Sequence, residues 1–86
     1  MTFYYSERFR KAYHTLSPEI QKLTDEKLRL LASSWRHPSL HTKRIQGTKD
    51  IWEARISLNY RMTFQKIKEG IFLRNLGPHD PTLRKP

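Results

Sequence analysis

The sequence has 86 residues, no cysteine, and 17 lysine and arginine residues against eight aspartate and glutamate residues, a formal net charge of +9. This length suits one domain over residues 1–86, and the absence of cysteine excludes disulfides and thiolate metal sites. No apolar run approaches the roughly 20 residues that span a bilayer, and residues 1–7 lack the features of a signal peptide, so we expect a soluble cytoplasmic protein that does not bind membranes.

The first fifteen residues predict a strand and a short helix. Residues 3–5 are Phe-Tyr-Tyr, and a short aromatic run of this kind is typical of a strand. Ser6 can cap a helix, and the acidic Glu7 suits the first helical turn. Because Phe9, Ala12 and Tyr13 then recur at helical spacing, we expect a helix over 7–15.

A second helix is predicted over 18–35. Ser17 is a capping residue, and Pro18 occupies the first helical position, where proline is favoured. The apolar residues that follow are spaced by about 3.6. Pro38 prevents the helix from continuing, so 36–39 is expected to be a loop. The apolar stripe consists of Ile20, Leu23, Leu28, Leu30, Leu31 and Trp35.

In the second half, the spacing of apolar residues changes from 3.6 to 2. Alternation of this kind predicts strands that are buried on one face. The order of elements then indicates an α+β domain, with an N-terminal strand and two helices packed on one face of a twisted antiparallel sheet. The last residues, 81–86, contain two prolines and are expected to be loosely held. The predicted strands are 52–57, 60–65 and 71–76, with a further short one over 43–46.

The alternation also predicts which side chains share a face. If Trp52, Ala54 and Ile56 pack against the helices, Arg55 points to the opposite face. By the same rule Tyr60, Met62 and Phe64 point inward, and Arg61 points outward. The third strand has apolar residues on both faces, and we expect Ile71, Leu73 and Asn75 inward with Phe72 and Arg74 outward.

Most of the excess charge lies in the second half. Residues 36–86 hold eleven basic and four acidic side chains, a net charge of +7, whereas residues 1–35 have a net charge of +2. Arginines on neighbouring strands, about 4.8 Å apart, can bind consecutive phosphates, and an outward aromatic ring can stack a base. A basic surface without a ligand is the alternative, but like charges in one plane repel and favour an anionic ligand.

The motifs of the second half resemble the RelE/ParE toxin superfamily, over essentially the whole chain. Its members typically have a basic residue ahead of a glycine, an alternating strand with an arginine, and a Tyr-Arg pair. The YafQ-like ribonuclease toxins carry a histidine near the place of His79. The matching segments are Lys43-Arg44-Ile45-Gln46-Gly47, Trp52-Glu53-Ala54-Arg55-Ile56, Asn59-Tyr60-Arg61-Met62-Thr63-Phe64 and Leu73-Arg74-Asn75-Leu76-Gly77-Pro78-His79-Asp80.

The resemblance implies the toxin of a type II toxin–antitoxin system, which cleaves messenger RNA without a metal or other cofactor, often on the ribosome, and so inhibits translation. In the implied reaction a ribose 2′-hydroxyl attacks the adjacent phosphate, leaving a 2′,3′-cyclic phosphate and a 5′-hydroxyl. This needs a proton acceptor, a proton donor and cations around the transition state. The resemblance also implies an antitoxin partner, whose acidic or amphipathic segment neutralises the arginines.

By this resemblance, Arg61 stabilises the transition state and Arg55 supports it. His79 is the expected proton donor, because imidazole titrates near neutrality. The proton acceptor stays open between Lys43, which is slightly favoured, Glu53 and the nearby His41. The expected catalytic set is Lys43, Arg55, Arg61 and His79, and the residues expected to contact RNA are Arg44, Glu53, Phe72 and Arg74.

Other functions are weighed against this one. A ParE-like chain would poison DNA gyrase and cleave nothing, but it needs no cluster of acid–base groups. A non-catalytic RNA-binding module would bind with a steep salt dependence and leave the RNA intact. A zinc site is not expected, because Pro38 separates His37 from His41 and no cysteine or acidic cluster is near.

Overall fold

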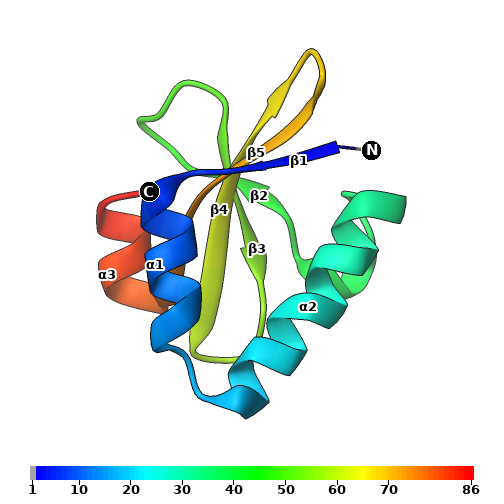
Figure 1. Cartoon of the computed structure of the whole chain (residues 1–86). Helices are drawn as coiled ribbons and strands as arrows, with labels where there is room; N and C mark the ends of the chain where they lie inside the picture. The colour runs from blue at the N-terminus through cyan, green and yellow to red at the C-terminus, as the bar shows by residue number, and fades with distance from the viewer. Residues whose placement is uncertain (1) are drawn as a thin grey trace.

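Five strands form one sheet in the order β1-β5-β4-β3-β2 (Figure 1). The computed structural model describes residues 2–86. The predicted α+β class is confirmed, but the sheet is mixed rather than wholly antiparallel as predicted, because β1 runs parallel to β5 while the other pairs are antiparallel. The elements are β1 (Thr2–Tyr5), α1 (Glu7–Thr15), α2 (Pro18–Ser33), the 3-10 turn η1 (Pro38–Leu40), β2 (Lys43–Arg44), β3 (Ile51–Arg55), β4 (Tyr60–Ile67), β5 (Gly70–Pro78) and α3 (His79–Arg84).

Both long helices begin where the sequence predicts. The Ser6 hydroxyl accepts a hydrogen bond from the Phe9 N–H at 2.9 Å, and the Ser17 hydroxyl accepts one from the Ile20 N–H at 3.3 Å. Each bond satisfies one of the N–H groups that a helix leaves unpaired at its start. No helix among residues 2–86 is long and apolar enough to cross a membrane.

The predicted end of the second helix is wrong by two residues. α2 ends at Ser33, because Ser34 has extended backbone angles and its N–H donates to the Leu30 carbonyl at 2.7 Å. Trp35 therefore lies outside the helix. Its ring meets the ring of Trp52 edge-on, with centroids 5.0 Å apart.

The core lies between α1, α2 and one face of the sheet. Alternate residues of β3, β4 and β5 point into it, which confirms the inward positions of Ala54, Ile56, Met62, Phe64, Ile71 and Leu73. Both tryptophans are half-buried and pack against this core. The buried apolar side chains are Phe9, Leu31, Leu40, Ala54, Ile56, Met62, Phe64, Ile71, Leu73 and Leu76. The face turned away from α1 and α2 is called the outer face below.

The inward position predicted for Asn75 is wrong. A register shift between Thr63 and Phe64 leaves Arg74 without a partner on β4, so Asn75 lies opposite Thr63 on the outer face. Leu76 takes the inward position and is 3 % exposed. One extra residue in a strand reverses the alternation beyond it, and a bulge of this kind leaves no mark in the hydrophobic pattern.

The prediction that the C-terminal residues 81–86 are loosely held is wrong. Residues His79–Arg84 form α3, which packs against β4 and β5, and Thr82 within it is only 2 % exposed. The Pro86 carbonyl accepts a hydrogen bond from the Thr63 hydroxyl at 2.8 Å, and the Lys85 carbonyl accepts one from the Asn75 amide at 3.1 Å. The end of the chain is thus fixed to the outer face.

The strands differ from the predicted bounds by a few residues. The short strand expected over 43–46 contains only residues 43 and 44, because the chain turns at Ile45, whose N–H donates to the Ile51 carbonyl at 2.8 Å. β4 and β5 are longer than predicted. Figure 1 shows their hairpin projecting beyond the helices at the top of the view.

Candidate active site

The predicted catalytic side chains of β2, β3 and β4 lie on the outer face as cross-strand pairs of neighbouring strands. Lys43 on β2 lies opposite Glu53 on β3, and Arg55 on β3 lies opposite Arg61 on β4. Directly paired residues of an antiparallel sheet point to the same face. The structure therefore brings Lys43, Glu53, Arg55 and Arg61 onto one face, and the outward positions of Arg55 and Arg61 are those that the alternation predicts.

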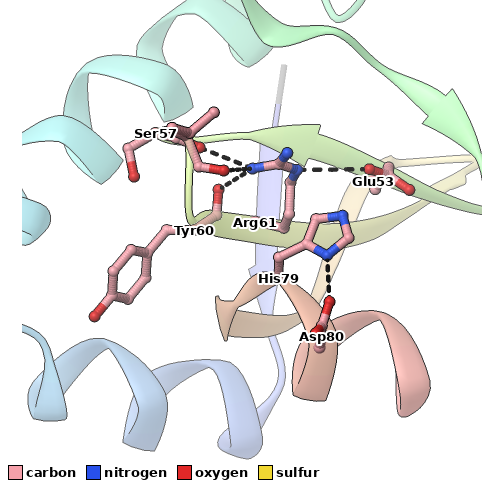
Figure 2. A network of polar contacts seen from close by, with 7 residues as sticks. Glu53, Ser57, Tyr60, Arg61, His79 and Asp80 are labelled. Atoms are coloured by element: carbon pink, nitrogen blue, oxygen red, sulfur yellow. Dashed lines mark hydrogen bonds and ion pairs between the residues drawn. The ribbon is translucent and has the colours of Figure 1, made fainter.

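Arg61 is buried, with 7 % of its surface exposed, and it holds the turn between β3 and β4. Its Nη1 donates to the carbonyls of Ser57 at 2.8 Å, Leu58 at 3.0 Å and Tyr60 at 3.0 Å (Figure 2). Its Nε lies 3.7 Å from the Glu53 carboxylate. These contacts fix the guanidinium in one orientation and leave Nη2 outside them.

Positive charge accumulates beside Arg61. Burial lowers the pKa of its guanidinium, the charge of Arg55 lowers it further, and Glu53 acts in the opposite direction. The Nε of Arg55 is buried and makes no hydrogen bond with any described residue. Two facing guanidinium groups next to a single carboxylate favour an anion at this place.

His79 reaches the same region from the start of α3. Its backbone N–H donates to the Asn59 carbonyl at 2.8 Å, which fixes the position of α3 against the β3–β4 turn. Its Nδ1 lies 2.7 Å from the Asp80 carboxylate, and this bond and charge hold the pKa of Asp80 below its ordinary value. Figure 2 shows the imidazole between Arg61 and Asp80. With Nδ1 engaged, Nε2 is the nitrogen available to a substrate.

Arg61 and His79 line one shallow pocket of about 480 Å³, with Leu58, Asn59 and Pro78 among its walls. A hollow of about 310 Å³ beside α1 and α2, with Tyr5, Phe9 and Tyr13 in its lining, contains none of the predicted site residues. The acid–base candidate and the buried arginine therefore meet at the β3–β4 turn. A guanidinium and an imidazole side by side can hold a phosphate and transfer a proton to one of its oxygens.

Other predicted residues lie elsewhere. Phe72 and Arg74 line a separate hollow with Ser6 and Arg8. The Arg74 guanidinium donates from Nη1 to the Gln65 side chain at 2.9 Å and from Nε to the Pro86 carbonyl at 3.3 Å, so it is partly occupied by the chain itself.

Arg44 and the histidines of the η1 region also lie apart from the pocket. Arg44 is paired with Trp52 and points to the helix side of the sheet. His41 is exposed at the end of η1, and the His37 ring is hydrogen-bonded to Ser39. Within residues 2–86, no group of three His, Cys, Asp or Glu side chains could hold a metal ion.

The sequence reasoning missed Asp80 and Asn59, which together orient His79. A signal for α3 was present, because Asp80 and Pro81 are residue types favoured in the first turn of a helix. Two prolines in the last six residues favoured an irregular end instead. The contact from Asn59 joins residues 20 positions apart, and no local pattern predicts it.

No model of a known protein family matches the chain, and no curated protein sequence does. Solved structures do match. The YoeB/ParE toxin from Agrobacterium tumefaciens is 10% identical, with a TM-score of 0.79 over 92% of this chain and 99% of that one. The toxin of the E. coli DinJ–YafQ toxin–antitoxin complex is 13% identical, with a TM-score of 0.78 over 93% of both chains. For the intact E. coli RelBE toxin–antitoxin complex the values are 22% and 0.72, over 91% of this chain and 95% of that one.

At these identities the likeness is one of fold. The likeness spans nearly the full length of each of these solved chains. The chain therefore has the fold of the RelE/ParE-like toxin superfamily.

Proposed function

We propose that this chain is the toxin of a type II toxin–antitoxin pair and a metal-independent endoribonuclease that cleaves messenger RNA in association with the ribosome. The observation that carries this proposal is the shared pocket of Arg61 and His79 beside the facing Arg55. A gyrase poison has no need of an imidazole next to clustered guanidinium groups. The fold, which several solved toxins share, supports the toxin role.

The reaction assigns a step to each group. The 2′-hydroxyl oxygen bonds to phosphorus while its proton passes to an acceptor on the outer face. The bond from phosphorus to the 5′-oxygen breaks, and the protonated imidazole of His79 gives its proton to that oxygen. Arg55 and Arg61 stabilise the negative charge that develops on the phosphate. The products are a 2′,3′-cyclic phosphate and a 5′-hydroxyl.

Two outer-face residues compete for the role of proton acceptor. Glu53 lies next to Arg61, and its carboxylate oxygen can accept a proton directly. Lys43 is exposed on the edge strand opposite Glu53, and its amine must first lose a proton. We assign the acceptor role to Glu53 and a phosphate contact to Lys43. In this case Glu53→Gln abolishes cleavage, whereas Lys43→Ala weakens RNA binding and leaves the cleavage step of bound RNA intact.

The test is cleavage of a labelled RNA in excess EDTA, alone and with translating ribosomes. We expect a 2′,3′-cyclic phosphate product, and we expect His79→Ala to lower the rate at least 100-fold, the scale of lost acid–base catalysis. His14→Ala is the matched control, because His14 is exposed on α1. If neither RNA nor ribosome-bound message is cut while His79→Ala stays toxic, the gyrase alternative replaces the nuclease.

The partner in this proposal is an antitoxin with an acidic or amphipathic segment. A net charge of +9 and the facing guanidinium groups of β3 and β4 suit a polyanionic or acidic partner. Solved neighbours with this fold include toxins in complex with antitoxins. Expression of the chain alone is expected to arrest growth. Normal growth at high expression of soluble protein would contradict the toxin role.

A further inference from the structure

The two tryptophans form a surface on the helix side of the sheet, away from the Arg61–His79 pocket. Trp35 follows α2, and Trp52 lies in β3, with the ring centroids 5.0 Å apart. Both rings are half-buried, so each keeps part of its surface open to solvent.

Exposed cations cover these rings. The Arg36 guanidinium lies 4.6 Å from the centroid of Trp35 and 5.5 Å from that of Trp52, and the Lys66 Nζ lies 4.2 Å from that of Trp35. Arg44 is exposed and paired with Trp52 across β2 and β3, so it points to the same side. Within residues 2–86, none of the three cations forms an ion pair. We call Trp35, Arg36, Arg44, Trp52 and Lys66 the tryptophan surface.

We propose that the tryptophan surface binds single-stranded RNA. Two aromatic rings with three unpaired cations around them match the alternation of base and phosphate along a strand. A stacked base gains more than an exposed cation does on the same ring. A base can therefore displace Arg36 or Lys66 from Trp35, and the displaced cation then binds a phosphate. An acidic protein segment would use the cations but leave the ring faces unused, so RNA is the better match.

The edge strand β2 joins this surface to the outer face. Consecutive residues of a strand point to opposite faces. Lys43 faces Glu53, and Arg44 faces Trp52. A strand of RNA that crosses the β2 edge therefore meets a cation on each side of the sheet. The inference rests on rings and charges alone and holds whether or not the outer face cleaves RNA.

The test uses tryptophan emission, because Trp35 and Trp52 are the only two tryptophans in the chain. The probe is a fully 2′-O-methylated oligonucleotide of ten nucleotides, which cannot undergo 2′-hydroxyl attack. The variant is Arg36→Gln/Lys66→Gln. The matched control is Lys22→Gln/Arg29→Gln, which removes the same charge from exposed positions of α2.

We expect the probe to quench the emission of the unmodified protein and of the control. In the Arg36→Gln/Lys66→Gln variant we expect the quenching to vanish, and the slope of log Kd against log salt to fall by about 1.4, or about 0.7 for each lost phosphate contact. Equal weakening in variant and control would overturn the proposal, because net charge alone would then explain binding. Binding of the probe to the unmodified protein, seen by anisotropy without a change in its emission, would also overturn the proposal.

A polyglutamate peptide of equal charge is the second probe. Quenching by this peptide equal to that by RNA would overturn the choice of RNA and assign the surface to an acidic protein partner. The outcome is separate from that of the cleavage assay. Lost cleavage with quenching retained contradicts only the nuclease, and cleavage without quenching contradicts only the tryptophan surface.

Discussion

Arg61 combines two roles in one side chain. The sequence pattern predicts its place on the outer face, and there it lines the pocket with His79. The sequence pattern does not predict that the Arg61 Nη1 also donates hydrogen bonds to three carbonyls of the β3–β4 turn. Buried charges are costly unless hydrogen-bonded, and these bonds stabilise Arg61 in a fixed orientation. Loss of activity in an Arg61 variant would therefore mix catalysis with stability, so His79 is the sharper probe of the chemistry.

The contact between His79 and Asp80 predicts that the stability of the fold depends on pH in the acidic range. Because His79 lowers the pKa of the Asp80 carboxyl, the folded state binds its proton more weakly than the unfolded state does. The contribution to stability is then fully present above the unfolded pKa of about 3.9 and is lost as the pH falls through the lower folded value. In a carboxyl-carbon NMR titration, we expect the Asp80 midpoint below the ordinary value.

The same titration of two variants identifies the cause of the lowered Asp80 pKa. His79→Ala removes both the hydrogen bond and the charge, so the Asp80 midpoint should rise toward its ordinary value. His14→Ala leaves the 2.7 Å contact in place and should leave the midpoint where it is. A midpoint that does not move in His79→Ala would show that the geometry of this pair differs in solution.

At the scale of elements, local signals were sufficient for the helix starts and for the faces of β3 and β4. Ser6 and Ser17 each cap a helix through their own hydroxyls, and Ala54 and Met62 alternate as the period-2 rule requires. Non-local contacts decided the rest. The bulge at Arg74 and the docking of α3 depend on how distant strands meet, and neither the hydrophobic period nor the turn residues carry that information. The sequence pattern also misses the place of Asn59 in the pocket, because Asn59 meets His79 only where α3 packs against the sheet.

The docking of α3 depends on a close approach at Gly77. A Cβ on Gly77 would lie 2.9 Å from the hydroxyl oxygen of the buried Thr82. We expect Gly77→Ala to lower the free energy of unfolding by about 1–3 kcal/mol, as overpacking does in a filled interior. Thr82→Ala removes the clashing oxygen, so the double variant should recover part of this loss. Urea unfolding of the four proteins measures the coupling. Additive effects would mean that α3 does not lie against Gly77.

For the whole molecule, the distribution of charge matters more than its sum. Residues 36–86 supply the cations of both surfaces, the outer face and the tryptophan surface, and β2 lies between them. Unpaired cations repel one another in the free protein and attract a polyanion when one is present. The same cations thus lower the stability of the free protein and favour the binding of a polyanion.

This predicts opposite effects of salt on the free and the bound protein. Salt screens the repulsion between groups such as Arg55 and Arg61, so between 0.05 and about 0.5 M NaCl the urea midpoint of the free protein should rise. A ligand at 100 times its Kd adds about 2.7 kcal/mol to the free energy of unfolding. With the 2′-O-methylated oligonucleotide at that excess in low salt, the midpoint should start higher and then fall, because salt weakens phosphate binding.

The variant Arg55→Gln serves as the control, because it removes one of the two facing guanidinium groups. Its free form should start with a higher midpoint and respond less to salt. If the free and bound proteins instead respond to salt in the same direction, the cations are not held in mutual repulsion, and the anionic ligand inferred from their arrangement loses its physical basis. Opposite slopes that converge at high salt would mean that one set of charges both destabilises the free fold and binds the RNA.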